Sequence, residues 1–226
     1  IAHDYATAAP EIFLAIAAMV LLMIGVFRGN GSTRMLSWLA VLSFAIALFM
    51  VLQGSGVSSV SFAGMYVADS FTAFAKAMVL IAAAAGLIMS LGYIKEEGMN
   101  RFENPVRFVL ATHGMMMMIS ANDLMALYMG IELQSLALYV IAAFKRDSLR
   151  STEAGLKYFV LGALSSGMLL YGCSLIYGFT GATGFDAIAA ALGVGVSTPY
   201  SKRISLGLSG SNSGKTALQS RVSIGA

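Results

Sequence analysis

The sequence predicts an all-α protein that crosses a membrane several times. Of its 226 residues, 58% are hydrophobic and 11% are charged, and the mean hydropathy is +0.80. The apolar residues form long runs, and a helix needs about 20 such residues to cross a bilayer core of roughly 30 Å. We therefore expect a multi-pass membrane protein with six transmembrane helices and the start of a seventh.

The first three predicted spans are continuous apolar runs over residues 12–27, 35–52 and 71–94. Lys76 is the one charged side chain inside them, five residues after the third run begins. Its four-carbon stem is long enough to carry the ammonium group to the membrane surface. We expect Lys76 to anchor the outer end of the third helix.

The next apolar stretch, residues 108–144, is too long for one crossing. Ser120, Asn122 and Asp123 interrupt it with side chains that can cap the start of a helix. We expect a fourth and a fifth helix joined by a tight turn at this point. A sixth span over 159–179 and the opening of a seventh over 185–196 complete the series.

Basic residues in the predicted loops indicate the orientation. Apart from Lys76 and Lys157, every basic residue before the tail falls in the first, third or fifth loop. These residues are Arg28, Arg34, Lys95, Arg101, Arg107, Lys145, Arg146 and Arg150. Such residues are retained on the cytoplasmic face. The N-terminus is therefore expected on the outer side.

The composition also excludes several functions. The single cysteine, Cys173, cannot form a disulfide within the chain or supply the thiolates of an iron–sulfur cluster or a structural zinc site. The net charge of +3 comes from the serine-rich basic segment 199–226, which predicts a disordered tail. We expect neither a metal site in this chain nor a nucleic-acid partner.

Glu132 lies deepest in a predicted span of all the charged residues. Placing a charge at the bilayer centre costs about 3 kcal/mol or more, so such a group usually faces protein or water and has a function. We interpret Glu132 as a proton-accepting group on an ion path. The alternative is a structural carboxylate bonded to a neighbouring helix.

Two further residues are candidates for the same path. Lys157 lies near the cytoplasmic end of the sixth span, about 12 Å in depth from Glu132, a distance that one or two waters can bridge. His113, in the fourth span, is a possible relay, although a satisfied core histidine is the more common role. Gly162 and Ser166 are interpreted as small residues for close helix contact.

Two segments resemble a known family. Residues 120–139, SANDLMALYMGIELQSLALY, and 151–166, STEAGLKYFVLGALSS, are similar to subunit N of alphaproteobacterial proton-pumping NADH:quinone oxidoreductase, respiratory complex I. The resemblance extends from about residue 9 to about residue 196. It implies an antiporter-like subunit fold, here truncated, with Glu132 as a central proton-path residue and Lys157 as an auxiliary one.

The resemblance further implies the organisation and partners of the chain. Residues 1–105 would form helices 1–3, residues 106–198 the first part of the antiporter-like repeat, and residues 199–226 a non-family tail, disordered or frame-shifted. The function would be proton translocation in the bacterial inner membrane, beside the neighbouring antiporter-like subunits, with a periplasmic N-terminus. NAD, FMN, iron–sulfur clusters and quinone would bind to other subunits.

The sequence departs from that family after about residue 198, where the seventh helix and its lysine would continue. Two other interpretations therefore stay open: a stand-alone cation/proton antiporter subunit, and a truncated membrane fragment that translocates nothing. The string GIELQ at 130–134 favours the complex I subunit. The isolated chain is expected to be inactive.

Overall fold

The computed structural model describes residues 5, 7–29, 32–54, 59–96, 102–144 and 148–193. The chain forms two units, Ile1–Leu175 and Ile176–Ala226. The first unit contains most of the described helices: α2 (Ala9–Arg28), α3 (Thr33–Gly54), α4 (Ser70–Glu96), α5 (Glu103–Ser120), α6 (Leu124–Ala142) and the greater part of α7 (Leu149–Thr180).

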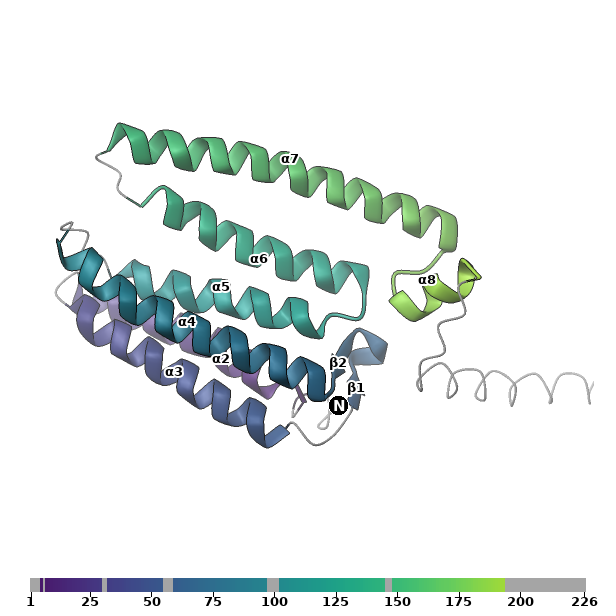
Figure 1. Ribbon diagram of the computed structural model, residues 1–226, viewed down its shortest axis with the longest axis horizontal. Coiled ribbons are helices and arrows are strands. Elements are labelled where there is room, and N and C mark those ends of the chain that lie inside the picture. The colour runs from purple at the N-terminus through teal and green to yellow at the C-terminus, as the bar shows by residue number, and fades with distance from the viewer. Residues whose placement is uncertain are drawn as a thin grey trace, which may run out of the picture. The chain divides into compact units, whose positions relative to one another are not determined.

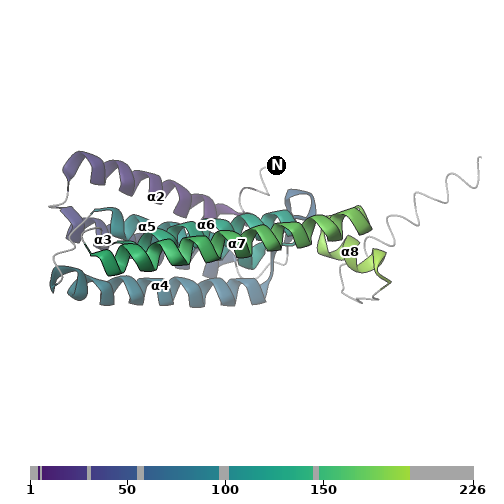
Figure 2. The same ribbon diagram turned by 90° about the horizontal axis from the view of Figure 1, so that it is seen from above.

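Helix α5 lies inside this bundle and contacts α2, α3, α4 and α6 (Figures 1 and 2). The core is built from large apolar side chains of α2, α3, α4 and α5, among them Leu14, Leu21, Leu36, Phe44, Leu80, Leu87, Val109 and Met116. Helices α2 to α5 therefore share one apolar core.

Five helices in the described part of the chain are long and apolar enough to cross a membrane: α2, α3, Ser70–Gly92 of α4, α6 and α7. The expected fourth span, α5, is not among them, because Glu103, Arg107 and His113 make it more polar. Ten of its 18 residues are buried. A helix surrounded by protein can carry polar side chains that a lipid-facing helix cannot.

The break between α5 and α6 lies where the sequence predicted it. The Asp123 carboxylate accepts a hydrogen bond of 2.8 Å from the Met125 amide and so caps α6. The two helices then pack backbone to backbone: a Cβ on Gly114 would lie 2.6 Å from the Gln134 nitrogen, and one on Gly130 would lie 2.9 Å from the Met118 nitrogen. Only glycine permits this approach.

A β-hairpin that the sequence analysis did not predict lies between α3 and α4. Its strands are β1 (Ser59–Ser61) and β2 (Tyr66–Ala68), antiparallel and joined by the short helix η2 (Phe62–Gly64). Asn122 bonds it to the α5–α6 turn, donating through its side chain to the Gly64 carbonyl and through its amide to the Met65 carbonyl, each at 2.9 Å. The hairpin therefore covers one end of the bundle.

Helix α7 begins at Leu149, ten residues before the expected start of the sixth span, and continues for 32 residues. Residues 150–153 are polar, so hydropathy did not place them in the predicted span, yet they form helix. Lys157 therefore lies about two turns into α7, further from the start of the helix than the sequence predicted.

The second unit, Ile176–Ala226, is described as far as residue 193. It contains the end of α7 and the short helix α8 (Phe185–Ala191). The predicted seventh span over 185–196 begins at Phe185, but its helix ends after seven residues, close to Gly193 with its positive φ of 68°. The remaining predicted residues of that span, 194–196, and the predicted tail, 199–226, lie outside the described residues.

Candidate functional site

Glu132 lies near the centre of α6, with eight residues of the helix before it and ten after it. Its side chain is half-buried. Because α6 is one of the helices suited to cross a membrane, the carboxylate lies far from either end of the span, as the sequence predicted.

The partner of this carboxylate is a hydroxyl on the next helix. Ser166 of α7 donates a hydrogen bond to Glu132 Oε1, and the Ser166 oxygen lies 3.0 Å from the hydroxyl of Tyr128. Tyr128 precedes Glu132 by one turn of α6. These three side chains form a continuous hydrogen-bonded chain across the α6–α7 interface, in which each hydroxyl can donate one proton and accept another.

Aromatic packing next to this chain holds α6 and α7 together. The ring of Tyr139 meets Tyr158 edge to face at a centroid distance of 5.0 Å and Phe159 at 5.7 Å. A Cβ on Gly162 would collide with the Tyr139 ring and hydroxyl. Gly162 is thus a contact residue, as predicted, whereas Ser166 is a hydrogen-bond partner of the candidate site that the sequence analysis treated as packing.

Lys157 does not lie with Glu132. Its ammonium group is 2.5 Å from Glu153 Oε1, one turn earlier on the same helix, and these side chains are 70% and 57% exposed. An exposed pair of this kind contributes little to stability. The structure therefore places Lys157 in an ion pair on the surface of α7, apart from the Tyr128–Ser166–Glu132 chain.

His113 lies on α5 and is half-buried. Its Nδ1 atom is buried and has no hydrogen-bond partner among the described residues. Nδ1 therefore lacks the bond that a satisfied core histidine would make there.

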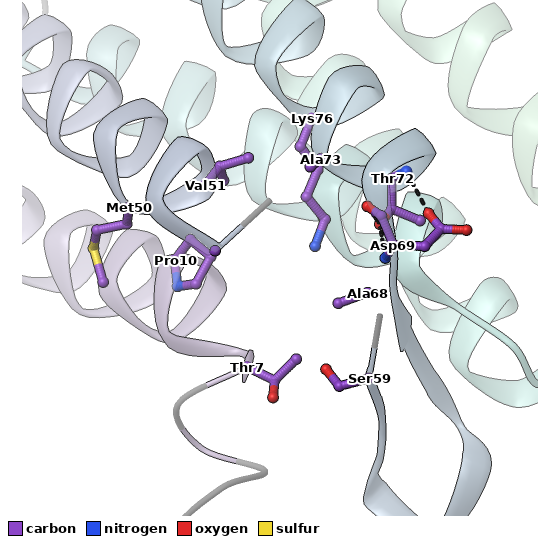
Figure 3. A pocket seen from close by; sticks show the side chains of 11 residues that line it. Thr7, Pro10, Met50, Val51, Ser59, Ala68, Asp69, Thr72, Ala73 and Lys76 are labelled. Carbon is purple, nitrogen blue, oxygen red and sulfur yellow. Dashed lines mark hydrogen bonds between the residues drawn. The ribbon is translucent and has the colours of Figure 1, made fainter. Parts of the chain in front are cut away.

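The expectation for Lys76 is wrong. Lys76 is only 4% exposed, and its ammonium group lies 2.5 Å from Glu11 Oε1 and donates a 2.9 Å hydrogen bond to the Tyr66 hydroxyl. It also lies 4.9 Å from the centre of the Tyr66 ring. The side chain points into the bundle (Figure 3) because a carboxylate, a hydroxyl group and an aromatic ring there interact favourably with its ammonium group.

Sequence reasoning missed Glu11 as its partner, although one signal was present. Glu11 lies at the beginning of the first apolar run, and Lys76 lies near the beginning of the third. Helices one and three of a series with short loops run in the same direction, so these two opposite charges lie on the same side and at similar depth. Their contact follows from that placement.

Among the described residues, no cluster of three or more His, Cys, Asp or Glu side chains is arranged to hold a metal ion. Cys173 is a free thiol, partly buried within α7.

The sequence over residues 121–219 matches the family described as NADH:quinone oxidoreductase/Mrp antiporter, transmembrane. The chain is 57% identical over 190 residues to NADH-quinone oxidoreductase subunit N of Parvibaculum lavamentivorans, which covers 84% of this chain and 39% of that protein. The corresponding protein of Paramagnetospirillum magneticum is 55% identical over 186 residues, 82% of this chain and 38% of the relative. Over more than four fifths of its length, the chain is similar to subunit N of NADH-quinone oxidoreductase.

The fold agrees with that similarity. The structure is similar to a chain of respiratory complex I from Thermus thermophilus, with a TM-score of 0.65 and 27% identity over 82% of this chain and 42% of the other. The antiporter-like fold class predicted from the sequence is thereby confirmed. The chain spans about two fifths of the length of the subunit N relatives it matches, and the predicted boundary at residue 198 stays a prediction.

Proposed function

We propose that the chain is the N-terminal part of a membrane subunit that translocates protons in NADH:quinone oxidoreductase. The names of its relatives support this assignment. The observation that carries it is the Glu132 carboxyl, positioned centrally in a membrane-spanning helix and bonded to Ser166. A stand-alone cation/proton antiporter subunit is the second candidate, because the matching family also includes Mrp antiporters.

In this function Glu132 takes up and releases a proton. A carboxyl in a low-dielectric interior changes its protonation when a nearby charge moves, because desolvation favours the neutral form and an adjacent cation favours the charged form. The hydroxyl of Ser166 stabilises the carboxylate by donating to it. The adjacent Tyr128 hydroxyl extends the hydrogen-bonded chain by one more group along which a proton can move.

We infer the orientation of the chain in the membrane from the basic residues in its loops. The start of α2 and the hairpin of residues 59–68 face the periplasm, and the loops that join α2 to α3, α4 to α5 and α6 to α7 face the cytoplasm. Lys157 then lies on the cytoplasmic half of α7, as an auxiliary group near the entry of the proton path. The partners are the other membrane subunits of the complex, and the redox cofactors belong to other subunits.

The test uses Glu132→Gln in the full-length subunit within its complex, reconstituted in sealed vesicles. The amide keeps the size and part of the hydrogen bonding but cannot titrate. We expect NADH-driven proton pumping to be lost while the complex assembles, and the matched variant Glu153→Gln to pump normally, since its carboxylate is exposed. If the Glu132→Gln variant pumps at the unmodified rate, Glu132 has only a structural role. If the vesicles exchange cations for protons without NADH, the stand-alone antiporter subunit is favoured.

A further inference from the structure

A groove lined by apolar and aromatic side chains runs along one face of α3. Its volume is about 580 Å³, and the residues that line it are Met35, Trp38, Leu39, Val41, Leu42 and Ala45. In Figure 1, α3 runs along the lower edge of the first unit. Trp38 and Leu42 are each 55% exposed, so this face of α3 is not packed against the other helices that the structure describes.

The groove has the length of one leaflet of a bilayer. Helix α3 is one of the helices suited to cross a membrane, and the groove extends from Met35, in its first turn, to Ala45, just past its middle. At ~1.5 Å per residue the rise over this distance is about 15 Å, which is half of a hydrocarbon core of roughly 30 Å. The acyl chain of a lipid in one leaflet can therefore lie along the whole groove.

Trp38 lies at the depth where membrane proteins place tryptophan. It follows Thr33, the first residue of α3, by about 8 Å along the helix axis. Tryptophan is enriched at the boundary between headgroups and hydrocarbon, because its ring is apolar while its indole N–H donates a hydrogen bond. The end of the groove near Met35 therefore belongs at the level of the lipid headgroups, and the end near Ala45 belongs in the hydrocarbon.

Two arginines lie at the headgroup end of the groove. Arg28, the last residue of α2, donates from Nη1 to the sulfur of Met35 at 3.3 Å, and Met35 lines the groove. Arg34 precedes Trp38 by four residues, and residues at that spacing share a face of a helix. Both arginines are exposed, and neither forms an ion pair with a carboxylate among the described residues. Their guanidinium groups therefore have N–H donors left for an anion.

We propose that this groove binds an anionic phospholipid, with the phosphate held by Arg28 and Arg34 and one acyl chain lying along α3 from Met35 to Ala45. Guanidinium groups bind phosphate through paired hydrogen bonds, and the groove buries apolar surface of the chain. The cationic group of a zwitterionic phospholipid offsets its phosphate charge, so the arginines select an anionic headgroup. The site does not depend on the role of Glu132; only its place in the cytoplasmic leaflet rests on the proposed orientation.

The test uses the complex with its full-length subunit in vesicles of phosphatidylcholine that contain a trace of a photoreactive lipid. The probe is phosphatidylglycerol with the photoreactive group in one acyl chain, and the reference is phosphatidylcholine with the same chains. Mass spectrometry measures how much of each lipid becomes attached to residues 35–45. We expect phosphatidylglycerol to label them at least about fivefold more, the factor that one basic residue near the membrane surface contributes. Equal labelling by both lipids, or no labelling because another subunit covers this face, would overturn the proposal.

Two sets of variants test the arginines and the groove separately. Arg28→Gln/Arg34→Gln should abolish the preference for phosphatidylglycerol, whereas Arg150→Gln, in the first turn of α7, should keep it. Ala45→Phe fills the deep end of the groove and should reduce the labelling, whereas Ile46→Phe, next to it but outside the groove, should not. All these positions are exposed, and substitutions at such positions usually change stability little. A preference that survives the double variant, labelling that Ala45→Phe leaves unchanged, or a loss in either control would each overturn the proposal.

Discussion

At the scale of single residues, the partner of Glu132 is a serine hydroxyl and not a lysine. The position of Glu132 could be predicted because one carboxylate in a long apolar run is visible in the sequence. Its hydrogen bond to Ser166 could not be predicted. The sequence around a serine that lies among glycines and alanines is the same whether the residue only fills space between helices or donates a hydrogen bond. The same limit applies to Lys76, whose direction depends on Glu11, more than 60 residues earlier in the chain.

The bond to Glu132 predicts a graded series at position 166. Ser166→Ala removes a hydrogen bond to a charged group, which contributes roughly 1.5–3 kcal/mol, so we expect proton pumping to fall while assembly is kept. Ser166→Thr retains the hydroxyl and should recover much of the rate. Ser165→Ala, at the exposed neighbouring position, is the control. Equal pumping in all three variants, measured in sealed vesicles, would show that the hydroxyl is dispensable.

Lys157 gives a contrasting prediction. Its pair with Glu153 is exposed, and such pairs spaced four residues apart on a helix contribute only about 0.3–0.5 kcal/mol. Lys157→Ala should therefore leave the thermal unfolding of the complex unchanged and reduce pumping less than Glu132→Gln. A loss of pumping as large as that of the Glu132 variant would place Lys157 on the essential path.

At the scale of helices and strands, polar residues had two different effects on the sequence prediction. The capping residues at 120–123 marked a real boundary, since they interrupt a long apolar run. The polar residues at 150–153 form the first turns of α7, which hydropathy alone could not distinguish from a loop. The hairpin of residues 59–68 was not predicted because strands of three residues show too little alternation to detect.

Close contact between α5 and α6 predicts sensitivity at the two glycines that permit it. Gly130→Ala places a methyl group 2.9 Å from the Met118 backbone nitrogen, and overpacking of this kind costs about 1–3 kcal/mol. We expect a lower unfolding temperature for the solubilised complex. Gly172→Ala on α7, where a Cβ meets nothing within 4 Å, is the matched control and should unfold at the unmodified temperature or above it.

At the scale of the whole molecule, the orientation inferred from the loop charges can be tested in intact cells. In a background with Cys173→Ser, Met65→Cys lies in the hairpin and Leu149→Cys at the start of α7, and the side chains they replace are 47% and 85% exposed. An impermeant thiol reagent added to the periplasmic side should label the first position and spare the second. The opposite pattern would reverse the proposed orientation.

The length of α7 has a consequence for the membrane around it. Its 32 residues extend about 48 Å at ~1.5 Å each, against a hydrocarbon core of roughly 30 Å. Tilting alone would require an angle above the 0–40° range of known spanning helices, so one end of α7 must stand clear of the lipid. The first turns, which carry the Glu153–Lys157 pair, are the polar end, and that pair would therefore meet bulk water and the headgroup layer rather than hydrocarbon.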